Sequence, residues 1–263
     1  MKRTAIVTGG YGAIGKAIAA GLARNGYRVF LVGRDLSRLQ TARSDLINHT
    51  ANKDIYIEQV DLSLHQQILE FSQRWMEPLH LLINNAATAP KHRTETSEGI
   101  ETQWATNVLG YVWMIRHFNV FMHNQHDARI VNVASYWAGG LDLKDPEFKK
   151  RSYNNDTAYR QAKQANRMLS VAFSENLKPF GVTVNSCHPG DVNSKLSNAF
   201  GFGGHETPDE GASTPLFLAL SNKMKEISGL YYEHLNPVKC VFSGNSGAVK
   251  QLFDLCLGYY SVL

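Results

Sequence analysis

The sequence predicts an α/β fold: a doubly wound parallel β-sheet of about seven strands with helices on both faces. Short β-branched runs alternate along the chain with longer runs of helical periodicity. Several strand-like runs, such as 79–84 and 129–134, are largely apolar, as is typical of strands covered by helices on both faces. The 263 residues show no repeat or linker, so we expect a single domain over residues 1–263.

Local signals place the elements. The expected strands cover 4–8, 28–32, 55–60, 79–84, 129–134 and 182–187. The expected helices cover 13–25, 36–48 and 64–76, with a fourth that begins after possible N-caps at 154–156. Gly26, Pro78 and Pro179 mark helix ends. The polar or glycine-rich stretches 141–155 and 194–211 are expected to be long surface loops.

Composition excludes several classes of protein. The formal charge of +4 comes from scattered basic residues, so no nucleic-acid partner is expected. Three widely spaced cysteines predict neither a disulfide framework nor a metal site, and a reducing compartment, the cytoplasm, is the simpler interpretation. No apolar run approaches the roughly 20 residues of a transmembrane segment. We expect no signal peptide, because the first strand already begins near Arg3.

A glycine-rich turn follows the first strand and opens the first helix. It reads Thr-Gly-Gly-Tyr-Gly-Ala-Ile-Gly over 8–15. Main-chain N–H groups at a helix N-terminus bind a pyrophosphate well, so this context favours a dinucleotide site over a purely structural tight turn. The residues expected to face the cofactor here are Gly9, Tyr11, Gly12 and Ile14.

The end of the second strand bears on cofactor choice. An NAD site often presents a carboxylate there to the ribose 2′-hydroxyl, whereas this chain has Gly33 and Arg34. A guanidinium suits a 2′-phosphate, so NADP(H) is favoured over NAD(H). The alternative is that Arg34 is a solvated turn residue. Arg38, one helical turn later, is a secondary candidate for the same phosphate.

Tyr159 and Lys163 lie four residues apart near the start of a helical pattern and therefore share one face. A neighbouring ammonium favours a phenolate, so we expect Lys163 to lower the pKa of Tyr159 and make it a general acid and base. The spacing alone occurs by chance in many helices, so other residues must support this interpretation.

These motifs and several others give the chain a resemblance to the short-chain dehydrogenase/reductases over nearly its whole length. The motifs that carry the resemblance, in the family's order, are the turn at 8–15, Asp61-Leu62, Asn84-Asn85-Ala86-Ala87, Asn107, Ser135, Tyr159 with Lys163, and Pro189-Gly190-Asp191-Val192-Asn193-Ser194. The resemblance implies a Rossmann-type fold. It also implies further cofactor contacts from Asp61, Leu62, Asn85, Ala86, Tyr159, Lys163, Pro189, Gly190, Val192 and Ser194.

The resemblance implies a mechanism as well. Ser135 would donate to the substrate oxygen while Tyr159 gives it a proton as hydride arrives from nicotinamide. Lys163 would hold the ribose hydroxyls, and Asn107 would anchor a water that returns protons. The departures from the family pattern are mild: Ala13, Ala87, Ser194 and Ala162 replace residues of similar size, and no catalytic position is lost.

Within the family, the chain resembles the retinol-dehydrogenase-like and WW-domain-oxidoreductase-like branch. The similar stretches are the long separation of Ser135 from Tyr159, the run 159–166, and the segments 210–214 and 229–232. That branch implies NADP(H) and a bulky apolar carbonyl, with reduction as the physiological direction. The loops 141–155 and 194–211 would select the substrate, and the run 201–204 would form a mobile lid.

Other interpretations stay open or are set aside. A non-catalytic NADP-binding sensor and a reductase of carbon–carbon double bonds are the alternatives to carbonyl reduction. A thiol mechanism at Cys187 with His188 is disfavoured, because neighbours on a strand point to opposite faces.

The aromatic stripe 111–122 is expected at the core or at a subunit interface, and the resemblance favours an interface, giving a homodimer or homotetramer. Trp137 is a candidate to line the substrate pocket or simply to pack.

Overall fold

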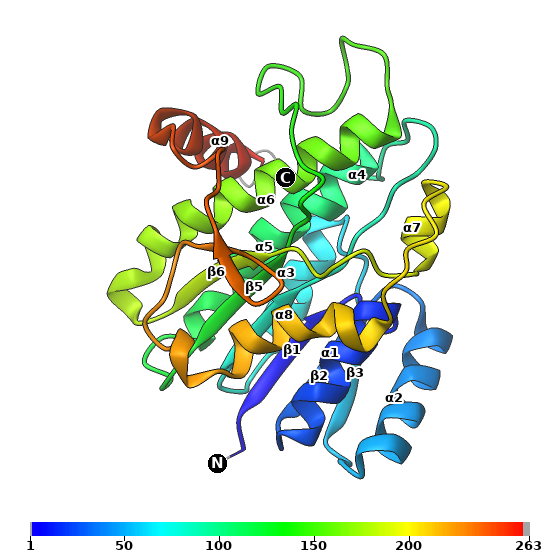
Figure 1. Ribbon diagram of the computed structural model, residues 1–263, viewed down its shortest axis with the longest axis vertical. Helices are drawn as coiled ribbons and strands as arrows, with labels where there is room; N and C mark the ends of the chain where they lie inside the picture. The colour runs from blue at the N-terminus through cyan, green and yellow to red at the C-terminus, as the bar shows by residue number, and fades with distance from the viewer. Residues whose placement is uncertain (1, 260–263) are drawn as a thin grey trace.

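The computed structural model describes residues 2–259 and shows one sheet between two layers of helices (Figure 1). The strand order is β3-β2-β1-β4-β5-β6-β7-β8. The strands are β1 (Thr4–Thr8), β2 (Arg28–Gly33), β3 (Ile55–Gln59), β4 (Leu81–Asn84), β5 (Arg129–Val133), β6 (Thr183–Cys187), β7 (Tyr231–Glu233) and β8 (Asn236–Val238). The predicted doubly wound α/β fold is confirmed.

The described part of the sheet has eight strands where the sequence predicted about seven. Strands β1 to β7 pair in parallel, and β8 pairs antiparallel with β7. The turn between them uses His234 and Leu235, both with positive φ. Strand β8 is three exposed residues long and contains Pro237, so it has neither the length nor the apolar alternation that predicts a strand.

One face of the sheet is covered by three helices of the chain. They are α1 (Ala13–Arg24), α2 (Leu36–Thr50) and α8 (Pro208–Leu220). Helix α1 consists largely of small residues, which allows a close approach of α8. A Cβ on Gly21 would lie 2.4 Å from a methyl carbon of Leu216, so a larger residue at that crossing would have to displace the Leu216 side chain.

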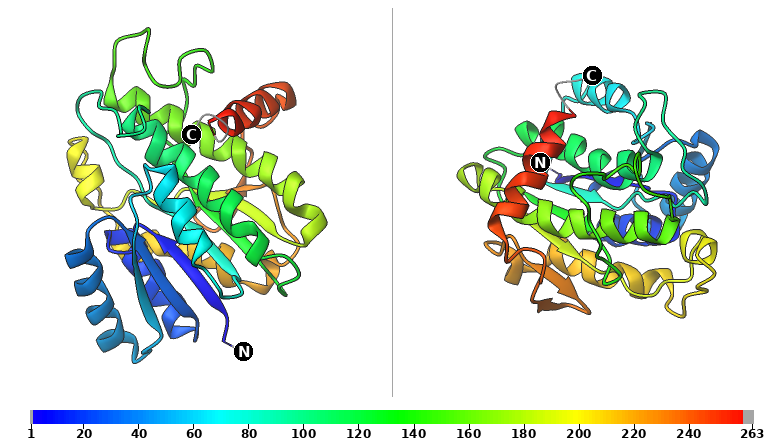
Figure 2. Two further views of the ribbon diagram at one scale, coloured as in Figure 1. Left: turned by 180° about the vertical axis from the view of Figure 1, so that it is seen from behind. Right: turned by 90° about the horizontal axis from the view of Figure 1, so that it is seen from above.

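The other face carries the larger core (Figure 2). Its helices are α3 (His65–Gln73), α4 (Thr102–Trp104), α5 (Gly110–Phe118), α6 (Asn155–Leu177) and α9 (Ser246–Gly258), with α9 on the outside of α6. Short 3₁₀ helices occupy Asn119–Phe121, Lys178–Phe180 and Asn222–Met224. Within the described residues, no helix combines the length and the apolarity that crossing a bilayer requires.

The aromatic stripe 111–122 belongs to this core. Trp113 and Phe118 are 0% exposed, and Phe118 packs against Phe71 and Trp75 of the α3 region. The core interpretation of the stripe is therefore confirmed for these side chains. Val120, in the same stripe, is 57% exposed, and the expected subunit interface and homodimer or homotetramer stay predictions.

Two segment predictions need correction. Helix α3 ends at Gln73 instead of residue 76, and the stretch 194–211 is not a loop throughout. It contains helix α7 (Lys195–Ala199), which begins because Ser194 and Ser197 form a reciprocal capping box, and the first turn of α8. The stretch 141–155, by contrast, has no helix or strand before Asn155, as predicted.

The chain crosses from one side of the sheet to the other between β3 and β4, so β1 lies between β2 and β4. At such a switch point the carboxyl ends of the central strands border a crevice, where ligands of open α/β sheets bind. Helix α7 and the segment that precedes α6 rise from this edge in Figure 1. The predicted site residues gather there.

Candidate active site

The turn between β1 and α1 is tied to the end of β4. The Thr8 hydroxyl accepts hydrogen bonds from the main-chain N–H of Asn85 at 2.8 Å and of Ala86 at 3.1 Å. In return, the side-chain amide of Asn85 donates to the Thr8 carbonyl at 2.9 Å. Asn85 and Ala86, predicted as cofactor contacts, thus also fix the shape of the glycine-rich turn.

Two glycines of this turn are required by close approach. A Cβ on Gly15 would lie 2.3 Å from the Gly9 carbonyl oxygen, and Gly9 itself has φ +65°. Helix α1 starts after Gly12 with no side chain capping its first N–H groups. Those N–H groups therefore remain available to an anion at the helix N-terminus.

Tyr11 connects the turn to the end of β2. A Cβ on Gly33 would lie 2.4 Å from the ring of Tyr11, so the ring occupies the space of a side chain at a strand end where other dinucleotide sites carry an acidic residue. The Arg38 guanidinium lies over the same ring, 4.4 Å from its centroid. Arg34 is exposed at the strand end. The structure thus places Arg38 in contact with the glycine-rich turn, although the sequence indicated it only as a secondary candidate for the 2′-phosphate.

Asp61 and Leu62 lie beyond the end of β3. The Asp61 carboxylate accepts from the N–H and the hydroxyl of Ser63, at 3.0 and 2.7 Å, and so shapes the turn before α3. The Leu62 side chain belongs to the core and is 6% exposed. Only the main chain of Leu62 is thus placed to face a cofactor.

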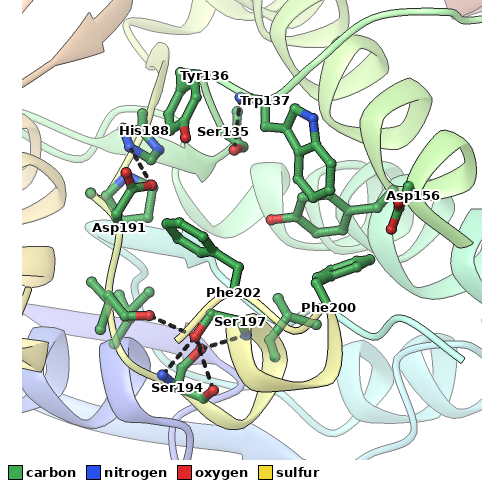
Figure 3. Close-up of a pocket in the computed structure, with 17 residues that line it drawn as sticks. Ser135, Tyr136, Trp137, Asp156, His188, Asp191, Ser194, Ser197, Phe200 and Phe202 are labelled. Atoms are coloured by element: carbon green, nitrogen blue, oxygen red, sulfur yellow. Dashed lines mark hydrogen bonds and ion pairs between the residues drawn. The ribbon is translucent and has the colours of Figure 1, made fainter. Parts of the chain in front are cut away.

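Ser135 and Tyr159 line a cavity of about 430 Å³ (Figure 3). Ser135 follows β5 by two residues, and Tyr159 lies in the first turns of α6, which begins at the N-cap Asn154. The Ser135 hydroxyl oxygen accepts from the Trp137 N–H at 3.1 Å. Its own proton can be donated to the Tyr159 hydroxyl or to a ligand oxygen in the cavity.

Lys163 lies beside this wall and is 2% exposed. Its Nζ donates to the Val133 carbonyl at 2.8 Å and lies 5.4 Å from the ring centroid of Tyr159. Burial lowers the pKa of Lys163 to about 7. The structure thus brings the Ser-Tyr-Lys set together, with the lysine available in both protonation states near neutral pH.

The pKa of Tyr159 differs from the expectation drawn from its spacing to Lys163. Burial raises this pKa above its ordinary range, and the hydroxyl of Ser135 is the neighbour that lowers it. Desolvation of a phenolate outweighs the influence of an ammonium that is itself partly neutral and bonded to Val133. In this state Tyr159 is a protonated phenol, the form that can donate a proton.

Asn107 lies in a π-helical turn, Ala105–Leu109, between α4 and α5. Its side-chain amide donates to the Thr88 carbonyl at 2.9 Å and accepts from the Thr88 N–H at 2.8 Å. The amide therefore holds the segment that follows β4. Its expected part in a proton relay stays a prediction.

The Pro-Gly loop closes the cavity from the β6 side. Pro189, Gly190, Val192 and Ser194 all line it, as does Ile14 of the glycine-rich turn. Gly190 has φ +110°, and its missing Cβ leaves room for the Glu206 carboxylate. The Ser194 hydroxyl is engaged as the N-cap of α7, where it accepts from the Ser197 N–H at 3.1 Å.

The segment 194–204, called the lid below, contains the run 201–204, whose mobility stays a prediction. The segment is anchored at its base. The Asp191 carbonyl accepts from the N–H groups of His205 and Glu206, at 2.9 and 3.1 Å. Phe200 from this lid lies 5.0 Å from the ring of Tyr159 and 5.4 Å from the ring of Trp137. Trp137 therefore does line the pocket, and the lid reaches the candidate catalytic phenol.

Sequence reasoning gave no role at this cavity to four residues of the region: Tyr136, Arg167, His188 and Asp191. Tyr136, His188 and Asp191 line the cavity, and buried Arg167 donates to the Ser135 carbonyl. Asp191 was quoted only as part of the Pro-Gly motif and His188 only as a neighbour of Cys187, because the signal that distinguishes them is their position in the fold. Cys187, beside His188, is buried, and burial raises the pKa of its thiol, which opposes a thiolate nucleophile. Nowhere in residues 2–259 do three potential metal-binding side chains of His, Cys, Asp or Glu cluster around a cation site.

Comparison with known proteins decides the family. The family model described as short chain dehydrogenase matches residues 3–201. The chain belongs to the short-chain dehydrogenase family. Its members are oxidoreductases that use a nicotinamide cofactor, which accords with the glycine-rich turn and the Ser-Tyr-Lys set of this short-chain dehydrogenase.

Relatives place this short-chain dehydrogenase in the retinol-dehydrogenase-like branch. It is 30% identical to human retinol dehydrogenase 13 over 253 residues, which cover 89% of this chain and 76% of that protein. It is 32% identical to bovine retinol dehydrogenase 12 over 250 residues, covering 88% and 77%. A crystal structure of an uncharacterized protein from Mycobacterium paratuberculosis has the same fold, with a TM-score of 0.81, 23% identity, and coverage of 97% and 91%.

Proposed function

We propose that this short-chain dehydrogenase reduces the carbonyl group of a small molecule with NADPH, and that it runs the reverse oxidation with NADP⁺. One observation carries the proposal: Ser135, Tyr159 and the Pro-Gly loop face one cavity, and Lys163 lies buried beside them. An acid, a hydrogen-bond donor and a cofactor-facing loop around one cavity suit hydride transfer to a carbonyl.

The residues present fit a dinucleotide. The uncapped N-terminus of α1, with Gly9, Gly12 and the main chain of Tyr11, would receive the pyrophosphate. Asp61 and Leu62 with Asn85 and Ala86 would border the adenosine half, while Lys163 and the Pro-Gly loop would border the nicotinamide half. When bound, the cofactor supplies the hydride.

Preference for NADP(H) is supported by two guanidinium groups and by a missing carboxylate. Arg34 directly follows β2 and Arg38 lies over Tyr11, so both flank the position expected for a ribose 2′-phosphate. The first acidic residue after β2, Asp35, is the N-cap of α2 and accepts from the Arg38 N–H at 3.0 Å. It is engaged in the helix cap instead of a ribose contact.

The chain's own residues then account for the proton chemistry. Ser135 donates a hydrogen bond to the substrate oxygen, and Tyr159, a protonated phenol here, transfers its proton to that oxygen as the carbonyl is reduced. Lys163 stabilises the resulting tyrosinate. We expect Asn107 to support reprotonation from the side of α4.

The rest of the cavity favours a substrate with an apolar part. Trp137, Phe200, Phe202 and Leu196 line it. Covering by the lid excludes water and strengthens the hydrogen bonds to the substrate oxygen. The three cysteines, all free, suit a reducing compartment, and on that ground we propose the cytoplasm.

The test is calorimetric titration with NADPH and NADH, followed by turnover of aldehydes, ketones and quinones in the same buffer. We expect tighter binding of NADPH and oxidation of NADPH with at least one carbonyl. Binding of NADPH without any turnover would contradict the reductase function and favour the sensor. Equal binding of both cofactors would contradict the preference for NADP(H).

A further inference from the structure

A polar corner, made of Tyr136, His188 and Asp191, occupies one side of the active-site cavity. Figure 3 shows these three side chains together, with Ser135 between them and Trp137. The His188 Nε2 lies 3.8 Å from the Asp191 carboxylate, and the rings of Tyr136 and His188 meet edge to face at 4.6 Å. The Ser-Tyr-Lys chemistry described above uses none of the three.

His188 presents an unused acceptor. The residue is 5% exposed, yet its Nδ1 has no hydrogen-bond partner among the described residues. Burial, with smaller contributions from His234, Arg167 and Lys163, lowers the pKa of His188 to about 3, so the ring is neutral at physiological pH. Nε2 faces the Asp191 carboxylate at 3.8 Å, which favours the tautomer with the proton on Nε2 and leaves Nδ1 as the acceptor.

Asp191 is a second acceptor without a cationic partner. Within residues 2–259 its carboxylate forms no ion pair with a lysine or an arginine, and His188 beside it is neutral. Burial raises the pKa of Tyr136, and so does the Asp191 carboxylate, which accepts a hydrogen bond from the Tyr136 hydroxyl and keeps that phenol protonated. The remaining lone pairs of the carboxylate stay available to a ligand. The main chain of Asp191 is fixed by the base of the lid, so the carboxylate has a defined place in the cavity.

The buried Nδ1 of His188 lacks a donor, which is costly, and native proteins usually satisfy such groups with a partner or a ligand. The Asp191 side chain is 27% exposed, so its carboxylate can be reached by a ligand. The two acceptors lie on one side of Ser135, and the aromatic wall of Trp137 and Phe200 lies on the other. A ligand whose carbonyl oxygen is held at Ser135 therefore meets a polar side and an apolar side at once.

We propose that the polar corner is a substrate subsite, and that the natural substrate is a carbonyl compound with a hydrogen-bond donor, a hydroxyl or an ammonium group, near the carbonyl. The proposal rests on the proposed carbonyl reduction and narrows its substrate class. An apolar or aromatic group of the substrate lies against Trp137 and Phe200. The donor group binds Asp191 and His188.

Matched ketones test the proposal. We would measure kcat/KM for β-hydroxypropiophenone, its methyl ether and β-aminopropiophenone, with the corresponding α-substituted acetophenones as a shorter set. We expect the hydroxy or amino ketone to exceed the ether by about ten-fold or more, because the ether leaves the acceptors without a donor. A larger gain for the amino ketone would identify an ammonium ligand, and a larger gain for the hydroxy ketone would identify a hydroxyl.

Variants locate the effect. Asp191→Leu and His188→Leu should bring the ratio of donor-bearing ketone to ether close to one. Asp156→Leu is the matched control, because Asp156 is a carboxylate that lines the same cavity near Trp137 (Figure 3). An unchanged ratio in Asp191→Leu, or a collapsed ratio in Asp156→Leu, overturns the proposal. So does a loss of NADPH affinity in Asp191→Leu with the ratio preserved, which would assign the corner to the cofactor.

Binding without turnover separates this proposal from the proposed function. With NADP⁺ present, calorimetry would compare the diol product of the hydroxy ketone with its methyl ether, and nitrogen NMR would follow the Nδ1 of His188. If no ketone is reduced but the diol binds more tightly and shifts the Nδ1 signal, reduction fails and the subsite stands. If ketones are reduced but neither preference nor shift appears, the subsite fails. Absence of turnover, preference and shift refutes both.

Discussion

The guanidinium of Arg167 donates to the main-chain carbonyl of Ser135, with Nε 3.1 Å from that oxygen. The same group donates to the Tyr231 hydroxyl at 2.7 Å and lies 3.6 Å from the centroid of the Tyr231 ring. Arg167 belongs to α6, Ser135 follows β5 and Tyr231 belongs to β7. One buried side chain therefore sets the position of the residue that is proposed to bind the substrate oxygen.

Replacement of Arg167 by methionine should lower kcat by up to about 100-fold, because small displacements of positioning groups have effects of that size. The free energy of unfolding should fall by about 2 kcal/mol, because the Ser135 carbonyl loses its donor. Steady-state kinetics and denaturant titration would measure both. NADPH affinity should change little, and Arg160→Met, an exposed position of the same helix, should change neither quantity. Normal kcat in Arg167→Met would contradict the positioning role.

Tyr159→Phe should abolish turnover and leave NADPH affinity within a few-fold. Phenylalanine keeps the ring contacts with Trp137 and Phe200 and removes only the hydroxyl that supplies the proton. Single-turnover kinetics with saturating NADPH would separate the chemical step from binding. Retained turnover would rule out Tyr159 as the acid.

Arg34→Ala and Arg38→Ala should each weaken NADPH binding by about 10-fold or more and leave NADH binding almost unchanged. The reason is that a charge-assisted hydrogen bond to a phosphate is worth about 1.5–3 kcal/mol. Calorimetric titration of both cofactors would measure the difference. Arg24→Ala, at the far end of α1, is the control. Equal losses for both cofactors would argue against recognition of the 2′-phosphate.

The buried Lys163 predicts a particular dependence of stability on pH. Its pKa falls from 10.5 in the unfolded chain to about 7 in the fold, so between these values the unfolded chain binds more protons. This residue therefore opposes folding fully below pH 7, and its cost disappears as the pH rises towards 10. Lys163→Met should be more stable than the native cofactor-free protein at pH 6 by about 3 kcal/mol, and the difference should shrink with rising pH.

The measurement for Lys163 is urea unfolding of both proteins from pH 6 to pH 10. The Val133 carbonyl keeps a donor in the variant, because the Tyr111 hydroxyl donates to it at 3.2 Å. Turnover should be lost at every pH. A stability difference that is constant with pH would show that Lys163 keeps an ordinary pKa in the fold.

Gly190→Ala should lower the free energy of unfolding by about 1–3 kcal/mol, since alanine is strained at φ +110°. Its methyl group would also displace the Glu206 carboxylate at the base of the lid, so NADPH affinity and kcat should fall together. Thermal unfolding and titration of NADPH would measure these effects. Gly203→Ala is the control, because Gly203 lies in the same lid with open space around it and no positive φ. Similar losses in both variants would contradict the role of Gly190.

Much of the active site was predictable from sequence because it depends on short-range rules. The turn at 8–15 is recognisable because a strand precedes it and a helix follows it. Helical spacing places Tyr159 and Lys163 on the same face of one helix. The Arg34 position at the end of β2 follows from the same local order. In each case the chemistry depends on residues that are neighbours along the chain or on a single helix.

The tertiary structure alone decided the rest. The aromatic stripe 111–122 proved to be core because α3 covers it, and periodicity cannot tell which partner covers an apolar face. The pKa of Tyr159 rises because its surroundings exclude water, an effect of packing instead of spacing. Arg167 with Ser135, and His188 with Asp191 and Tyr136, acquire their roles from burial and from contacts between separate elements. The sequence by itself therefore determined the fold and the candidate reacting groups, whereas long-range contacts, which depend on packing between separate elements, decided how those groups are held and which protons they keep.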